Sequence, residues 1–379
     1  MIYDICVAGL GGIGGAVAEH CARRGARVIG LEQFSRGHDL GSSTGRTRMI
    51  RQAYFENPAY VPLVRRSYDL WSALARDSGE DLLALTGVLS VGKETSEIIA
   101  GTRRAAREHQ IEIQSFTARE VTRHYPILRV HKDEVGILEP GGGVLKPERA
   151  LAAQLAVAEA RGAELRFDVR MAEWRWRNER FEIMLNDESS VTARCLVLAV
   201  GPWIQKEAAT LGTRIEVERN VQVWFETTSG RFTPEEMPAF LLNREGLPAP
   251  LYGFPDFGDG IKAAFHGSGE LTDPDAVDRE INPGRDIEPV ARALEAWLPG
   301  TAKKPLAAKV CLYSLTPDKN FIIDRHPEYG GLILCGGFSG HGFKFAPVVG
   351  EIVADLAMDG ATRHPIDFLS LRRFAKSPA

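Results

Sequence analysis

Three glycines near the start of the chain have the spacing of a turn that holds a diphosphate. Gly9, Gly11 and Gly14 stand at G-x-G-x-x-G spacing directly after a short apolar run. The first glycine allows a tight bend, the second lets backbone approach a pyrophosphate, and the third lets a helix pack against a strand. Glu32 ends the next apolar run, where a carboxylate can accept hydrogen bonds from both hydroxyls of an adenosine ribose. These four residues predict a site for a dinucleotide with an unphosphorylated ribose, FAD or NAD rather than NADP.

Strands and a helix must flank the glycines for this site to form. Residues 3–8 are an apolar run typical of a strand buried on both faces. The helix that follows is expected to end at Gly25, a left-handed C-cap, with Arg23 and Arg24 complementing the helix dipole. Residues 28–31 then form a second buried strand. Because these signals agree, we interpret this segment as the start of a dinucleotide-binding fold.

Length and charge limit the class of protein. A chain of 379 residues exceeds what one hydrophobic core usually holds, so two domains are expected. With 46 Lys+Arg against 50 Asp+Glu, the net charge of −4 gives no reason to expect a nucleic acid or an anionic membrane as partner. The apolar N-terminal run is short, lacks a basic flank and breaks at Gly9, so we expect neither a secretion signal nor a membrane span, which fits a cytoplasmic protein.

The cysteines are odd in number and scattered, without a C-x-x-C pair. They are Cys6, Cys21, Cys195, Cys311 and Cys335. This pattern indicates neither a disulfide framework nor a zinc site, and no metal is expected. All except Cys311 lie in apolar strand or helix contexts and are interpreted as inert core thiols.

A loop rich in Gly, Ser and Thr follows Glu32 and carries three arginines. They are Arg46, Arg48 and Arg51. Arginines so close together usually form a solvated face. After the second strand of a dinucleotide fold they can instead face the cofactor or an anionic substrate, and the residues alone leave both interpretations open.

The middle of the chain changes from mixed helices and strands to mostly strands, interrupted by one helical piece near residues 289–297. A buried strand over residues 193–200 ends on Gly201, where a ligand approaches the carboxyl edge of a sheet. Residues 214–312 form a β-rich stretch, and the C-terminal segment is strand, glycine loop and helix again. We expect an α/β protein with a Rossmann-like dinucleotide-binding domain at residues 1–83, 144–211 and 318–379, and a second domain of mostly antiparallel β-sheet plus helices (α+β) at 84–143 and 212–317.

Four further segments carry a resemblance to a known family. They are TGRTRMIRQAY, YGFPDFGDGIKAAFH, VCLYSLTPDKNFIIDRHP and GGFSGHGFKF, and they follow the glycine motif in this order. GFSGHGFKF with an upstream V-C-x-Y is much more specific than the glycine motif, because several independent chemical groups recur. Over nearly its whole length the chain closely resembles the monomeric sarcosine oxidase and N-methyltryptophan oxidase-like flavoproteins, FAD-dependent amine oxidases of the D-amino acid oxidase-like superfamily.

The resemblance implies FAD as the cofactor of the first domain. In that family the cysteine of V-C-x-Y carries FAD through a thioether to the flavin 8α-methyl group, and the matching residue is Cys311. Arg48 matches an arginine that lies against the flavin ring, and His341 lies in the glycine loop beneath it. The residues expected at the cofactor are Gly9, Gly11, Gly14, Glu32, Ser43, Arg48, Gly201, Cys311, Gly340, His341, Gly342 and Lys344.

The resemblance also implies a set of catalytic residues. Lys262 matches the base that activates oxygen near flavin N5, although a strand lysine is by itself more typical of a solvated edge. Arg51 and Lys344 match the ligands of the substrate carboxylate, and two tyrosines border the substrate. The expected catalytic residues are Lys262, His266, Arg51, Lys344, Tyr252 and Tyr313.

The resemblance implies the oxidation of a secondary amine, and these residue types suit that reaction. Arg51 can bind a carboxylate bidentately while Lys344 adds a point charge, so that a C–H bond beside an unprotonated nitrogen can transfer hydride to flavin N5. Oxygen then takes the electrons near Lys262 and gives hydrogen peroxide, and water hydrolyses the imine product, which releases formaldehyde if an N-methyl group was oxidised. Either His266 or Tyr313 can accept the amine proton.

The substrate and the electron acceptor stay open. The family has histidines where this chain has Ser43 and Thr44, and the loop at residues 243–248 also departs from the family. An N-methyl amino acid of the sarcosine type is the first expectation. The alternatives are a cyclic imino acid such as pipecolate or proline, a bulkier N-substituted amino acid, or an FAD dehydrogenase with an acceptor other than O2. A non-enzymatic flavin-binding protein is disfavoured because every expected catalytic group is present. We expect a small amino acid and O2 as partners, and a monomer.

Overall fold

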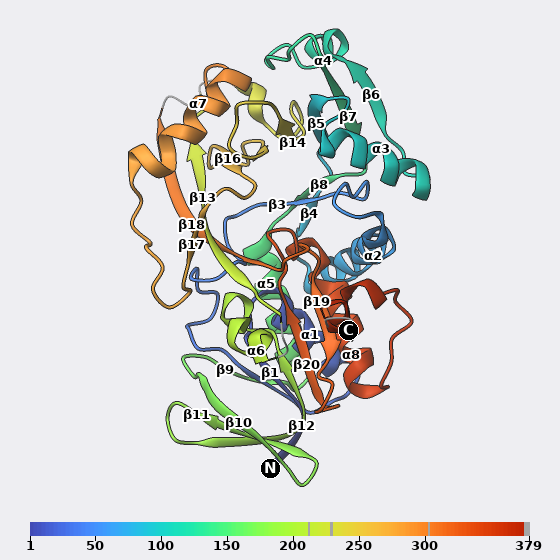
Figure 1. Cartoon of the computed structure of the whole chain (residues 1–379), viewed down its shortest axis with the longest axis vertical. Helices are drawn as coiled ribbons and strands as arrows, with labels where there is room; N and C mark the ends of the chain where they lie inside the picture. The colour runs from blue at the N-terminus through green and yellow to red at the C-terminus, as the bar shows by residue number, and fades with distance from the viewer. Residues whose placement is uncertain (211–212, 228–229, 302–303, 375–379) are drawn as a thin grey trace, which may run out of the picture.

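Two large β-sheets, placed one beyond the other along the long axis of the molecule, form its framework (Figure 1). The computed structural model describes residues 1–210, 213–227, 230–301 and 304–374. Within these ranges the two sheets share no strand, and a small third sheet lies between them.

The first sheet has a parallel centre. Its strands are β1 Ile2–Ala8, β2 Val28–Leu31, β9 Glu164–Arg166, β10 Met171–Arg177, β11 Arg180–Leu185, β12 Ser190–Leu198, β19 Ile322–Arg325 and β20 Leu332–Gly336. The order β9-β2-β1-β12-β20 is parallel throughout, β19 pairs antiparallel with β20, and the hairpin β10–β11 extends from β12. Ligands of such open sheets bind beyond the carboxyl ends of the strands.

Helices cover one face of the first sheet. They are α1 Gly12–Arg23, α2 Val61–Ser78, α5 Pro147–Ala160 and α8 Ala346–Met358. Ile5 and Val7 of β1 join the apolar core beneath α1, α5 and α8, which pack together. Cys6 and Ala8 point to the opposite face, toward the hairpin β10–β11 and α6 Gln205–Thr210. β1 is therefore buried on both faces, as its apolar run predicts.

The second sheet is antiparallel except where β14 lies beside β5. Its strands are β5 Val88–Lys93, β6 Gln114–Thr117, β7 Glu134–Glu139, β13 Glu216–Phe225, β14 Ala239–Asn243, β15 Leu251–Phe254, β16 Ile261–Phe265, β17 Glu270–Thr272 and β18 Pro305–Leu315. The helices of this half are α3 Glu97–His109, α4 Ala118–His124 and α7 Glu288–Trp297. The small third sheet consists of β3 Arg48–Ile50, β8 Gly143–Leu145 and β4 Leu83–Ala84.

The expected α/β fold is confirmed, with a parallel Rossmann-like sheet and a second, mostly antiparallel one. The domain boundaries stay a prediction, and the one between residues 211 and 212 lies outside the described residues. In the part of the chain that the structure describes, no helix combines the length and the apolar character needed to cross a membrane.

Candidate active site

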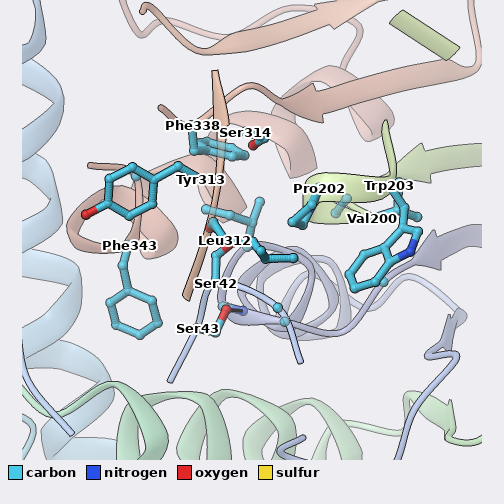
Figure 2. Close-up of a pocket in the computed structure, with 18 of the residues that line it drawn as sticks. Ser42, Ser43, Val200, Pro202, Trp203, Leu312, Tyr313, Ser314, Phe338 and Phe343 are labelled. Carbon is cyan, nitrogen blue, oxygen red and sulfur yellow. Dashed lines mark hydrogen bonds between the residues drawn. The ribbon is translucent and has the colours of Figure 1, made fainter. Parts of the chain in front are cut away.

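One elongated cavity runs from the carboxyl ends of the parallel strands to the second sheet. Its volume of about 700 Å³ lies in the range of small-molecule sites, about 300–1,000 Å³. Figure 2 shows part of its wall: Val200, Pro202 and Trp203 lie on one side, and Tyr313 and Phe343 lie on the other. Ser42, Ser43 and Leu312 lie between these two groups. The cavity therefore has room for a long ligand that spans both sheets.

The glycine turn forms one end of this cavity. Gly9 has φ +88°, and a Cβ on it would lie 2.5 Å from the carbonyl oxygen of Ala199. A Cβ on Gly14 would lie 1.8 Å from the carbonyl oxygen of Gly9. The turn thus packs against β12 and α1 as the motif predicts, and the start of α1 faces the cavity with Gly11 and Gly12. Ser43 lies beside it, its hydroxyl accepting a hydrogen bond of 2.9 Å from the Gly12 amide.

A methyl group at Gly9 should abolish cofactor binding. In the Gly9→Ala variant the added Cβ meets backbone that cannot move aside, and the positive φ strains any L-residue. We expect the flavin-to-protein absorbance ratio of the purified protein to fall by about tenfold or more. Gly141→Ala is the control, because a Cβ there meets no atom within 4 Å. Normal flavin content in Gly9→Ala would contradict the placement of the cofactor.

Glu32 lies at the carboxyl end of β2, where the motif predicts a ribose-binding acid. The side chain is buried but lines the cavity. Its carboxylate accepts hydrogen bonds from the Leu10 amide at 2.8 Å and the Phe34 amide at 3.1 Å. These two donors fix the carboxylate without using all of its acceptor sites, so it can still bind hydroxyl groups.

The segment from Ser42 to Arg48 connects the glycine turn to the second sheet. The Arg48 guanidinium donates to the carbonyl oxygens of Ser42, Thr44 and Thr47. Cys311 of β18 faces the same space, with Sγ 3.7 Å from Nη2 of Arg48. The structure thus brings Arg48 and Cys311 together on the cavity wall. The other four cysteines are buried in the apolar cores, as expected.

Lys262 is buried at the centre of the second sheet, not on a solvated edge. Its ammonium donates to the carbonyl oxygens of Gly45 at 2.7 Å and Thr47 at 2.9 Å. Burial, reinforced by the neighbouring Arg48 cation, lowers the pKa of Lys262 well below the ordinary lysine value. Arg48 and Phe254 line the cavity and Lys262 lies directly behind them, its Nζ 4.8 Å from the Phe254 ring centre.

Arg51 lies in the cavity wall and already has a carboxylate partner. Its Nη2 is 2.7 Å from both oxygens of Glu56, and its Nη1 donates to the Ala53 carbonyl at 2.9 Å. The rings of Tyr54 and Phe55 flank the guanidinium at 4.7 and 4.4 Å. Burial acts to raise the pKa of Glu56, but the Arg51 charge prevails and lowers it to about 2. Glu56 was not expected from the sequence, where nothing distinguishes it from a surface glutamate.

Lys344 also lies over the ring of the same tyrosine. Its Nζ is 5.2 Å from the centre of the Tyr54 ring and donates to the His341 carbonyl at 2.9 Å. Burial and the nearby Arg51 cation lower the pKa of Lys344 to about 7. Arg51 and Lys344 both line the cavity, so the structure brings the two expected carboxylate ligands together. The part of the cavity around these two residues is here called the chamber.

The side chain of His341 is committed to internal contacts. Its Nδ1 is 2.5 Å from the Tyr54 hydroxyl, and its Nε2 is 3.1 Å from the Lys319 carbonyl, so Nε2 carries the proton. Burial lowers the pKa of His341 to about 3, which keeps the ring neutral. Gly340, with φ +79°, lies under Tyr313: a Cβ there would come within 2.4 Å of that ring. His341, Gly340 and Gly342 line the cavity.

The side chains of three further expected residues, His266, Tyr252 and Tyr313, line the same cavity. The Tyr313 hydroxyl lies 3.5 Å from His266 Nδ1, and the Tyr252 ring packs edge-on against His266. Burial lowers the pKa of His266 to about 4 and raises that of Tyr252 to about 12. Burial also raises the pKa of Tyr313. All three groups are therefore neutral at pH 7.

The far side of the cavity holds a contact that the sequence did not reveal. Gly201 lies at the end of β12 with φ +57°, and Trp203 follows it in the wall. The Trp203 indole N–H donates to Asp275 at 2.7 Å, and the ring packs against Phe34. Asp275 also lines the cavity. Trp203 follows β12 of the first sheet and Asp275 follows β17 of the second sheet, so the two halves of the molecule meet here. Among the described residues, no cluster of three His, Cys, Asp or Glu side chains could hold a metal ion.

The open parallel sheet, its glycine turn and the long cavity define a class of protein: an oxidoreductase that binds a dinucleotide cofactor. The sequence matches the FAD dependent oxidoreductase family over residues 4–356, and the chain belongs to this family. FAD, expected over NAD from the resemblance, is thereby confirmed as the cofactor. The bent glycine turn, the free acceptors of Glu32 and the length of the cavity fit such a ligand.

Curated relatives and solved structures extend over the whole chain. Monomeric sarcosine oxidase of Streptomyces avermitilis is 40% identical, over 100% of this chain and 99% of the relative. N-methyl-L-tryptophan oxidase of Yersinia pestis is 29% identical, over 99% of this chain and 100% of the relative. The structure of NikD, an unusual amino acid oxidase essential for nikkomycin biosynthesis, superposes with a TM-score of 0.85 at 25% identity, covering 97% of each chain. The resemblance drawn from the sequence motifs is confirmed.

Proposed function

We propose that this enzyme oxidises a secondary amine that carries a carboxylate, most directly an N-methyl amino acid, with O2 as the electron acceptor. The observation that carries the proposal is the pair of cations, Arg51 and Lys344, both close to the Tyr54 ring in a chamber that also holds Glu56, the internal carboxylate partner of Arg51. Two cations without a matching excess of anions attract an anionic substrate. The names of the two curated relatives support an N-methyl amino acid.

The chamber residues have separate tasks in this proposal. Arg51 binds the substrate carboxylate through its planar fork, and Glu56 has to give up part of its bidentate contact when the substrate enters. Lys344 adds a second charge. The two cations also disfavour a protonated amine, because a like charge nearby lowers the amine pKa. Tyr313 and His266 line the part of the cavity proposed for the nitrogen; the neutral His266 imidazole can accept its proton, whereas the phenol of Tyr313, whose pKa is raised, serves as a hydrogen-bonding group.

FAD, when bound, supplies the redox chemistry by accepting a hydride and returning the electrons to O2. Lys262 provides the charge for the second half of the reaction. An ammonium has three N–H donors, and two of them are held by Gly45 and Thr47. The charge of Lys262 lies directly behind Arg48 and Phe254 of the cavity wall, where it can stabilise the anion that forms as O2 is reduced in a site of low polarity.

We propose that the flavin is attached to Cys311. The thiol lines the cavity and lies against Arg48, whereas the other four cysteines belong to the apolar cores. After acid precipitation, the yellow colour of the unaltered enzyme should stay in the pellet, and Cys311→Ala should release all flavin into the supernatant. Cys195→Ala, a change in the core, should keep its flavin. Colour in the Cys311→Ala pellet would refute this attachment.

Carboxylate binding should weaken as the pH rises through 7. The pKa of Lys344 is about 7, so its charge is present below that pH and is lost above it. We expect the Kd of acetate, which has no amine of its own, to rise by about tenfold between about pH 6 and about pH 8.5. The Kd is read from the change in flavin absorbance. Lys344→Met should bind acetate weakly at every pH, and a slope equal to that of the unaltered enzyme would exclude Lys344 as the titrating group.

The chamber also favours two alternative kinds of substrate. Met49, Phe55 and Leu241 form an apolar part of the wall near Arg51 and pack with Tyr252. An N-methyl amino acid with an apolar side chain, or a cyclic imino acid, suits such a wall. A panel of N-methyl and cyclic amino acids, tested for flavin bleaching under argon, decides between them. Peroxide measured in air separates an oxidase from a dehydrogenase.

We further expect the enzyme to be a monomer in the cytoplasm. Sedimentation of the purified enzyme tests its oligomeric state.

A further inference from the structure

Arg51 is enclosed by the chain that follows it. Residues 51–56, here called the arginine turn, fold back so that the Ala53 carbonyl and the Glu56 carboxylate both bind the guanidinium. Because the turn makes these contacts, the direction of the guanidinium depends on where the turn lies. The turn has little regular structure of its own, so other elements must hold it in place.

Glu139, the last residue of β7, holds the start of the turn. Its side chain is 4% exposed, and its two oxygens accept hydrogen bonds from the amides of Gln52 at 2.6 Å and Ala53 at 2.9 Å. Both backbone groups of Ala53 are therefore hydrogen-bonded: its N–H donates to Glu139, and its C=O accepts from Arg51. Hydrogen bonds to a charged acceptor are the stronger kind, so this contact fixes the backbone next to Arg51.

Gly101, in the middle of α3, supports the other end of the turn. A Cβ on Gly101 would lie 2.6 Å from the Phe55 carbonyl oxygen and 2.9 Å from the Phe55 Cβ. Its own φ is not in the left-handed region, so the helix does not require glycine here for backbone reasons. Glycine is required here because the arginine turn lies too close to α3 to leave room for a side chain.

We propose that Glu139 and Gly101 are positioning residues that hold the arginine turn so that Arg51 can receive the substrate carboxylate. The inference rests on the proposed function, which gives Arg51 that task. Neither residue lines the cavity, so both act through Arg51 and not by touching a substrate. Small misplacements of binding groups can change rates by about 100-fold, so such support is a functional requirement.

The first test compares two carboxylates at opposite ends of one strand. Glu139→Gln keeps the shape but turns one hydrogen-bond acceptor into a donor facing an amide N–H, and we expect the Kd of acetate to rise by about tenfold. Glu134→Gln is the matched control, because Glu134 is equally buried on β7 and pairs with Arg244, remote from the chamber. The readout is acetate binding to the holoenzyme, together with KM and kcat for N-methyl amino acids. A positioning role predicts a larger change in KM than in kcat.

The second test does not depend on a buried charge. Gly101→Ala should strengthen α3, because alanine is the better helix former. It should nevertheless weaken acetate binding by displacing Phe55 and the turn. Arg104→Ala, an exposed change in the same helix, is the control. Gly101→Ala keeps the inference testable even if Glu139→Gln fails to fold.

The outcomes separate this inference from the proposed function. If replacing Arg51 leaves the Kd of acetate unchanged, the proposed function fails. If replacing Arg51 weakens binding but Gly101→Ala, and Glu139→Gln where it folds, bind acetate as the unaltered enzyme does, the positioning role is refuted. Weakened binding in both variants, with normal binding in Glu134→Gln and Arg104→Ala, supports it. A crystal structure of Gly101→Ala should show the arginine turn moved away from α3.

Discussion

The Lys262→Met variant should react with O2 about 100- to 1,000-fold more slowly in its reduced form than the unaltered enzyme. Methionine has a similar length but no charge, so the developing anion loses its stabilising cation. The amine half-reaction uses Arg51 and Lys344 instead, and anaerobic reduction by an N-methyl amino acid should stay within about twofold. Stopped-flow absorbance of the flavin, with and without O2, measures the two half-reactions separately.

Lys93→Met is the control for this variant. Lys93 lies in the same sheet but is partly exposed, and pairs with Glu245 outside the cavity. It should behave as the unaltered enzyme in both half-reactions. An equal loss of both half-reactions in Lys262→Met would refute the assignment of Lys262 to oxygen. The carbonyls of Gly45 and Thr47 would then be no more than partners of a buried structural lysine.

Loss of Arg51 should have the largest effect on substrate binding. A direct Arg51→Met change would strand Glu56 as a buried, unpaired carboxylate and destabilise the fold. The double variant Arg51→Met/Glu56→Gln avoids this, and it should bind acetate about 100-fold more weakly than the unaltered enzyme, because a charged hydrogen-bond partner is worth about 3 kcal/mol or more. Binding is measured by titrating the oxidised flavin.

The single variant Glu56→Gln is the comparison for the double one. It leaves Arg51 in place and removes the internal anion that competes for it, so acetate should bind more tightly than to the unaltered enzyme. If both variants bind acetate with the same Kd, Arg51 does not hold the carboxylate. Because the pKa of Glu56 is about 2, its competition should be constant across the pH range of the assays.

The sequence predicted those features that are encoded locally. The turn at Gly9 and Gly14, the helix behind it and the acid at Glu32 follow one another within a single strand–helix–strand unit, so their spacing indicates their geometry. The positions of Cys311, Lys262 and Lys344 came from a family resemblance. No local pattern places these three residues around one cavity.

Contacts between distant segments could not be predicted. Glu139 meets the amides of the arginine turn only because β7 ends beside it, and nothing around this residue in the sequence marks it. Trp203 and Asp275 likewise come from different halves of the molecule. The burial of Lys262 depends on the sheet order, which places β16 between β13 and β15 and so makes its strand central. A lysine on an edge strand would have the same local sequence.

In the proposed reaction two cations, Arg51 and Lys344, orient the substrate by its carboxylate. The most direct test mixes the oxidised enzyme under argon with an N-methyl amino acid that it oxidises, and in parallel with the amide of the same compound. We expect rapid bleaching of the flavin by the acid and reduction at least about 100-fold slower by the amide, whose neutral group cannot pair with Arg51 and Lys344. Bleaching at equal rates by both compounds would contradict this role of the two cations.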